Sequence, residues 1–152
     1  MPLVIDTPHA LKDFIGRELG VSEWFTVTQD RIRRFADSTE DHQWIHEDAD
    51  RARRESPYGT AIAHGFLTLS LIGHLARQAF EVRGVRLIVN YGLNRVRFPS
   101  PVLADSRIRA RVALQSLKEF PDCFEAALLV TVEGENAPKP CCVVEWLVRY
   151  YV

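Results

Sequence analysis

The second half of the chain alternates between apolar and polar positions, the pattern of half-buried strands. Four such segments are rich in β-branched residues and are separated by turns that contain proline, glycine or asparagine. They are residues 85–97, 106–117, 124–133 and 143–151. Long strands joined by short turns predict an antiparallel sheet.

Residues 65–80 are apolar on nearly every side when they are placed at the helical period. A helix that is apolar all round is a buried one, so we expect it to lie across one face of the sheet. His64 and Gly65 form the tight turn that opens this helix. The predicted fold class is therefore α+β, a single domain over residues 1–152 in which an antiparallel β-sheet wraps a long central helix.

Shorter elements are expected in the first third of the chain. Thr7 stands before a proline, a typical helix start, and apolar residues at helical spacing predict a helix that runs to Gly20. Residues 24–28 then read as a strand. Thr28 can cap a second helix that ends near Thr39, and a short charged helix follows at Asp48 or Asp50.

The segment just beyond the second helix, residues 41–48 with the sequence DHQWIHED, reads as a loop. It carries a carboxylate at Asp41 and an imidazole at His46, five positions apart, and such a pair can hold and activate one water molecule. Further along, Gly65 opens the apolar helix, and helix starts present free N–H groups that suit a developing oxyanion. The first segment would supply part of an acid/base site, and the start of the helix would supply part of an oxyanion site.

Composition narrows the classes of partner. Apolar residues make up 47% of the 152 residues and the formal net charge is −1, so nothing favours nucleic acid or an anionic membrane. Small molecules and further copies of the chain are the expected partners. The longest apolar runs are interrupted well before membrane-spanning length. Cys123, Cys141 and Cys142 lack paired spacing and the N-terminus has no secretion signal, which favours a cytoplasmic location.

Taken together, these motifs and this predicted fold resemble the MaoC-like, (R)-specific enoyl-CoA hydratases, which have the hot-dog fold. The signature of that family has the form Asp-x-Asn-Pro-x-His-x-Asp, and Asp41, His46 and Asp48 fall in step with it. The resemblance therefore implies a single hot-dog domain.

One branch of the family resembles the chain more specifically. Gln43 and Trp44 replace the usual Asn-Pro, which is similar to the branch that contains the nodulation-protein-N-like dehydratases. Residues 63–68 (AHGFLT) and 91–99 (YGLNRVRFP) resemble the same branch. Matching motifs cover roughly residues 24–102, and over the rest of the chain only the pattern of strands is similar.

The resemblance implies a reaction and a set of site residues. Asp41 and His46 would orient a water for addition across the double bond of a trans-2-enoyl thioester, and the Gly65 amide would polarise the thioester carbonyl. Which side chain is the base and which the acid stays open. The implied substrate contacts are Trp44, His64, Phe66, Ser70 and Asn94. No metal or redox cofactor is implied, and the substrate would be carried by coenzyme A or an acyl carrier protein.

Some positions keep a second interpretation. The family often has a serine eight positions after the helix-opening glycine, where this chain has Gly73, and Ser70 is a candidate replacement. His64 could shape the turn instead of contacting substrate. Trp44 could line an acyl tunnel or only pack against the helix.

Two further patterns were weighed as ligand sites. His42 and His46 lie four positions apart, but no third and fourth zinc ligands are spaced nearby, so we expect no metal. Arg107, Arg109 and Arg111 alternate with apolar residues. A solvated sheet face is the simpler interpretation of these arginines, and contact with the phosphates of coenzyme A is the alternative.

Two other functions stay open. A hot-dog thioesterase usually relies on a carboxylate on or beside the central helix, and residues 65–80 contain none. A non-catalytic acyl-binding module would need only the pocket, and it has no need to bury a pair such as Asp41 and His46. Apolar strands with an uncovered edge favour pairing with a second copy, so a homodimer is expected.

Overall fold

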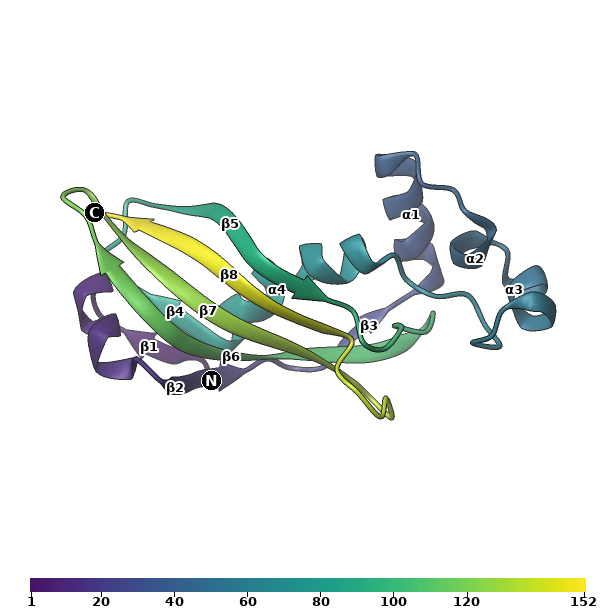
Figure 1. Ribbon diagram of the computed structural model, residues 1–152, viewed down its shortest axis with the longest axis horizontal. Helices are drawn as coiled ribbons and strands as arrows, with labels where there is room; N and C mark the ends of the chain where they lie inside the picture. The colour runs from purple at the N-terminus through teal and green to yellow at the C-terminus, as the bar shows by residue number, and fades with distance from the viewer.

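The computed structural model describes all residues from Met1 to Val152, and its centre is one helix packed against one curved sheet (Figure 1). The helix is α4 (Gly65–Ala79). The sheet has six strands in the order β2-β6-β7-β8-β5, with β3 also paired to β6, and every pairing is antiparallel. The strands are β2 (Arg17–Val21), β3 (Phe25–Val27), β5 (Leu87–Arg97), β6 (Ser106–Glu119), β7 (Cys123–Gly134) and β8 (Cys142–Tyr151). The α+β prediction is confirmed, and the four long strands lie where the alternation placed them.

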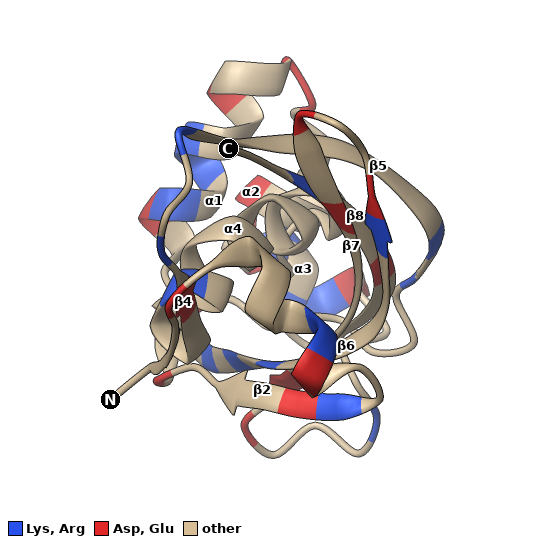
Figure 2. Cartoon of the chain, turned by 90° about the vertical axis from the view of Figure 1, so that its left-hand side faces the viewer, with Lys and Arg blue, Asp and Glu red and all other residues tan.

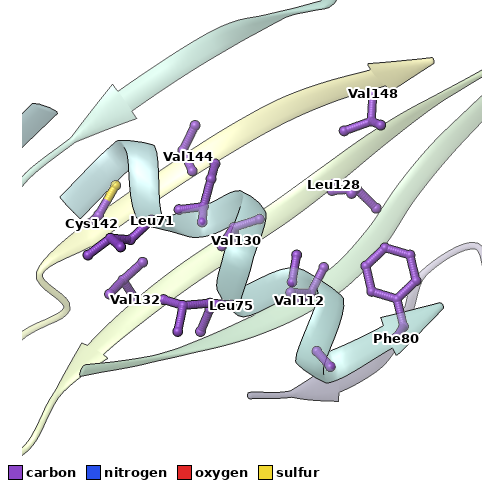
Figure 3. Packing of buried hydrophobic residues seen from close by; sticks show 14 of the residues in the cluster. Leu71, Leu75, Phe80, Val112, Leu128, Val130, Val132, Cys142, Val144 and Val148 are labelled. Atoms are coloured by element: carbon purple, nitrogen blue, oxygen red, sulfur yellow. The ribbon is translucent and has the colours of Figure 1, made fainter. Parts of the chain in front are cut away.

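The core lies between α4 and the concave side of the sheet. Figure 3 shows Leu71 and Leu75 of α4 beside Val130, Val132 and Val144 of β7 and β8. Leu75 and all three valines are fully buried. Branched side chains on alternate strand positions therefore form the surface that receives the helix.

The first expected helix is wrong beyond its first turns. Thr7 does cap a helix, but this is a 3-10 helix that covers only Pro8–Phe14. The chain then turns at Gly16, which has a φ of 80° and donates its N–H to the Leu114 carbonyl at 2.7 Å. Residues after the turn pair with β6 as strand β2, so Leu19 reaches the core from a strand. Pairing with a distant strand has overridden a local helical spacing.

Two very short strands were not predicted. β1 (Leu3–Ile5) and β4 (Phe80–Val82) form a two-stranded parallel sheet at the C-terminal end of α4. Strands of three residues show little periodicity, and Phe80 also continues the apolar run that predicted the helix.

Three helices lie together beyond the N-terminal end of α4 (Figure 1): α1 (Gln29–Thr39), α2 (Trp44–Glu47) and α3 (Ala49–Glu55). The predicted caps are present. Thr28 accepts a hydrogen bond from a first-turn amide of α1, and Asp48 does the same for α3. The expectation of a loop over residues 41–48 is wrong in part, because His46 lies in the single turn of α2.

The sequence led us to expect a helix buried on every side, and for α4 this expectation is wrong. In Figure 2 the strands curve around the helix. One stripe of side chains along the helix is nevertheless exposed. The stripe consists of Phe66, Ser70, His74 and Arg77, which recur at helical spacing. No helix of the structure has both the length and the apolar character needed to cross a membrane.

Candidate active site

Asp41, His46 and His64 meet where the segment after α1 approaches the start of α4. One side-chain oxygen or nitrogen atom from each residue lies within 4.8 Å of the others. His46 and His64 are buried, with 8% and 2% of their surface exposed, whereas Asp41 is exposed. The structure thus brings together the two residues that the motif singled out and adds His64 to them.

The hydrogen bonds of His46 fix which of its ring nitrogens is basic. Nδ1 lies 2.7 Å from the carbonyl oxygen of Ile62. A carbonyl only accepts, so Nδ1 carries the hydrogen and Nε2 of the neutral ring keeps its lone pair. Burial lowers the pKa of His46 from its ordinary value of 6.5, and the bond to Ile62 opposes this only in part. His46 is therefore neutral near pH 7, with Nε2 able to accept a proton.

The backbone around His46 is held from two directions. The side-chain amide of Gln29 in α1 donates to the His46 carbonyl at 2.7 Å, and the Ile62 amide donates to the Ile45 carbonyl at 3.1 Å. Ile62 itself forms an isolated antiparallel bridge with Leu103. The imidazole is thus attached to the segment that leads directly into α4.

The first turn of α4 leaves backbone donors free. Leu67 and Thr68 donate their amides to the His64 carbonyl, whereas the amides of Gly65 and Phe66 donate to no backbone carbonyl. No side chain caps this end of the helix. The two amides therefore offer N–H groups at the positive end of the helix dipole, the property that an oxyanion site requires.

The structure gives a reason for the glycine at position 65. A Cβ atom on Gly65 would lie 3.2 Å from two ring carbons of Phe98. The space beside the Gly65 Cα is filled by this aromatic ring, which follows β5. Glycine is needed for the close approach of Phe98.

The remaining predicted substrate contacts are spread over the surface. The guanidinium of Arg51 lies over the ring of Trp44, with its Cζ atom 4.2 Å from the ring centre. Phe66, at the start of α4, is 71% exposed. Ser70 donates its hydroxyl hydrogen to the Phe66 carbonyl at 2.7 Å, so that donor is already used within the helix. Asn94 is exposed on β5, at the irregularity in its pairing with β8.

A cavity of about 720 Å³ runs along α4 after its first turns. It lies between the helix and strands β4, β5 and β8, and most of its lining residues are hydrophobic. Ser70 and Gly73 contribute to its helical wall, and Leu93 and Trp146 to the opposite wall. The indole N–H of Trp146 donates to the Asn90 side-chain oxygen at 2.8 Å, which fixes the ring.

The arginines of β6 are already paired with carboxylates. Arg109 and Arg111 both bind Glu133, at 2.8 and 3.1 Å, and Arg107 binds Glu135. These pairs run between β6 and residues at or just beyond the end of β7. The structure supports a solvated sheet face and gives no support to a phosphate site at these arginines.

The two histidines that were weighed as joint zinc ligands lie in different clusters. His46 is grouped with Asp41 and His64, whereas His42 is grouped with Asp37 and Glu47. Each group of three has side chains that could hold a metal ion, and the fold brings together ligands that sequence spacing alone did not indicate. In the first group each histidine uses one ring nitrogen on a backbone carbonyl.

Sequence reasoning missed the residues that hold the site together. The Gln29 side chain and the carbonyl of Ile62 position His46, and Phe98 covers Gly65. A polar residue in the first turn of a helix and an apolar residue before a turn are common, so these positions carry no distinctive signal.

Comparisons with known proteins agree with this geometry. A family model described as MaoC like domain matches residues 11–133. The chain is 48% identical over 136 residues to 3-hydroxyacyl-thioester dehydratase Z of Mycobacterium tuberculosis, and this alignment covers 89% of each chain. It is 43% identical over 139 residues to nodulation protein N of Rhizobium meliloti, covering 90% of this chain and 86% of the relative.

A solved structure extends the likeness to the fold. The (R)-hydratase from A. caviae, involved in PHA biosynthesis, superimposes with a TM-score of 0.67 at 22% identity. The superposition covers 86% of this chain and 96% of the hydratase. Together with the family match over most of its length, this shows that the chain has the hot-dog fold and belongs to the MaoC-like dehydratase family, whose members are hydratases and dehydratases.

Proposed function

We propose that the protein catalyses the reversible hydration of trans-2-enoyl thioesters to (R)-3-hydroxyacyl thioesters. The observation that carries this proposal is the placement of neutral, buried His46 within 4.8 Å of the Asp41 carboxylate. The free amides of Gly65 and Phe66 lie at the start of the adjoining helix. The name of the mycobacterial relative, a 3-hydroxyacyl-thioester dehydratase, supports the class of substrate.

The proposed chemistry divides the work between the two side chains. A water held by Asp41 and His46 attacks the β-carbon while Nε2 of His46 takes one of its protons. The electron pair of the double bond moves onto the thioester oxygen, where the Gly65 amide stabilises the enolate. His46 then returns the proton to the α-carbon, which restores the site. The Asp41 carboxylate stabilises the imidazolium that exists between these steps.

The function is tested by two measurements on the same sample. Loss of the absorbance of the conjugated enoyl thioester in crotonyl-CoA reports hydration, and a free-thiol assay reports hydrolysis of the thioester. Hydration without thiol release is the expected result. Thiol release would indicate a thioesterase, although α4 carries no carboxylate, and binding without either reaction would indicate an acyl-binding module.

The pH profile should show the titration of His46. Because its pKa lies below 6.5, kcat/KM should be on a plateau at pH 7 and fall only on the acid side of 6.5. The unfolded chain binds this proton more readily, so stability also declines as the pH falls, and circular dichroism at each pH must show folded protein. A rate that increases as the pH is lowered through 6.5 would contradict the role of His46.

We infer that the acyl chain of the substrate occupies the cavity along α4. Its apolar lining suits methylene groups, and it begins at Leu69, one turn after Gly65. Gly73 leaves this wall open, because a Cβ atom there would meet nothing nearer than an Arg77 nitrogen at 4.0 Å.

Gly73→Leu should therefore shorten the acyl chains that the enzyme accepts. Each methylene that the new side chain excludes should cost about 0.8 kcal/mol, roughly fourfold in kcat/KM for long enoyl thioesters. Turnover of crotonyl-CoA by the same variant is the internal control and should change little. Equal losses for short and long substrates would show that the chain does not occupy this cavity.

We also propose that the protein is a homodimer joined through β5. This strand is at one edge of the sheet, and Ile88 and Tyr91 on it are each 53% exposed. Edge strands with exposed apolar side chains usually pair with another strand. Sedimentation should give twice the chain mass of 17.4 kDa, and a monomer at micromolar concentration would contradict this assembly.

A cytoplasmic location belongs to the same proposal. All three cysteines are free and buried, which is usual for proteins of reducing compartments. Expression of a tagged chain in its own cells, followed by fractionation, would test the location. Coenzyme A and acyl carrier protein both remain suitable carriers of the substrate.

A further inference from the structure

His64 connects the two halves of the site, through both its backbone and its side chain. Its backbone carbonyl receives the first two amide hydrogen bonds of α4, which makes it the residue at the helix start. Its ring nitrogen Nε2 lies 2.9 Å from the backbone carbonyl oxygen of Asp41. Its ring also stacks on that of His46, with 3.8 Å between the ring centres and an angle of 24° between the planes.

The hydrogen bonds of His64 leave no ring nitrogen for the substrate. The Asp41 carbonyl only accepts, so Nε2 carries a hydrogen and donates it. Nδ1 is buried without a hydrogen-bond partner, and only 2% of the residue is exposed. The ring of Phe35 lies 5.0 Å away, measured between ring centres. A substrate therefore has no surface of His64 to contact, in contrast to the role that the family resemblance implied.

The segment that His64 holds has little other support at Asp41. Glu40, the preceding residue, has a φ of 59°, a left-handed conformation that few residues other than glycine adopt. The chain reverses there as it leaves α1, and Asp41 itself is exposed. The partly buried hydrogen bond from His64 to its carbonyl fixes the position of the Asp41 backbone relative to α4.

We propose that His64 is a positioning residue, which sets the distance between the Asp41–His46 pair and the Gly65 amide. This inference rests on the proposed hydration reaction. The hydrogen bond to the carbonyl places Asp41, the ring stack orients His46, and the backbone of the same residue begins the helix that presents Gly65. A displacement of reacting groups by about 1 Å can reduce a rate roughly 100-fold, so this geometry matters for turnover.

Three variants separate the contacts of His64. His64→Gln keeps an amide donor near the place of Nε2 but removes the stacked ring. His64→Phe keeps an aromatic ring and removes the donor, and His64→Ala removes both. We expect kcat for crotonyl-CoA to fall roughly 10- to 100-fold in the Phe variant, with KM nearly unchanged, and to fall further in the Ala variant. The Gln variant should recover part of the loss.

The pH profile and a histidine control complete the activity test. His9→Gln, at an exposed histidine remote from the site in sequence, should keep wild-type kcat. The acid limb of the pH profile should persist in the Phe variant, because His46 is the group that titrates, and it should move toward higher pH, because His64 lowers the pKa of His46. Loss of that limb would make His64 itself the proton-transfer group and overturn the proposal. A lower unfolding temperature with unchanged kcat would also overturn it.

Hydrogen exchange without substrate provides a readout that does not depend on the reaction. We expect the peptide that contains residues 40–48 to exchange faster in the Phe and Ala variants than in the wild type, and the Gln variant to lie between them. If the wild type shows no hydratase activity but exchange responds in this way, the proposed function fails while the positioning contact stands. Wild-type exchange and wild-type kcat in His64→Phe would overturn the inference.

Discussion

Turnover should fall about 100- to 10,000-fold when either member of the acid/base pair is replaced, while the protein stays folded. Asp41→Asn removes the charge at an exposed position. His46→Asn removes the basic Nε2, yet its amide nitrogen can take the place of Nδ1 and donate to the Ile62 carbonyl. The loss in kcat should therefore come from proton transfer and not from a broken support.

The measurement is kcat for crotonyl-CoA beside thermal unfolding of each variant. His42→Asn is a matched control, since it replaces an exposed histidine of the same segment whose ring binds Glu47. It should retain turnover close to that of the wild type. Near wild-type activity in His46→Asn would remove His46 from the reaction.

The second large effect is expected at the start of α4. Gly65→Val should lower kcat about 100-fold or more, because its side chain must displace Phe98 and will disturb the amide that we propose as the donor to the thioester oxygen. Folding should survive, because Phe98 is 44% exposed and its ring has solvent into which it can move.

A double variant separates crowding from the loss of the oxyanion contact. Gly65→Ala introduces only a Cβ atom, at 3.2 Å from the Phe98 ring. If that contact displaces the amide, adding Phe98→Ala should restore much of the kcat lost in Gly65→Ala. Unimpaired turnover in Gly65→Val would exclude the amide as the stabiliser of the enolate.

Periodicity predicted those parts of the fold whose environment repeats along the chain. β6 buries Ile108, Ala110, Val112 and Leu114 at alternate positions, so its sequence alone defines a strand with one inner face. Residues 17–21 lack such a signal and become a strand only because β6 offers an edge for pairing. The exposed stripe of α4 carries a partial signal, since Ser70, His74 and Arg77 recur at helical spacing, but Phe66 is as apolar as the residues that the sheet covers.

The candidate site shows the same division. The spacing of Asp41 and His46 is local, and α2 brings the two side chains together over that short distance. The bonds that give His46 its tautomer come from Ile62 and its backbone anchor from Gln29, far along the chain. Which nitrogen accepts a proton is decided by these partners, and a sequence motif does not contain them.

The order of features along α4 has a consequence for how substrate preference can evolve. The groups proposed for the reaction all lie at or beside its first turn, where Gly65 meets the segment that supports His46. The cavity begins at Leu69 and continues beyond Gly73, on later turns of the same helix. With the acyl chain bound as proposed, substitutions on those turns can alter the acyl group that fits without moving any reacting atom. Such a helix lets a lineage adopt new substrates by single mutations while its chemistry is inherited intact.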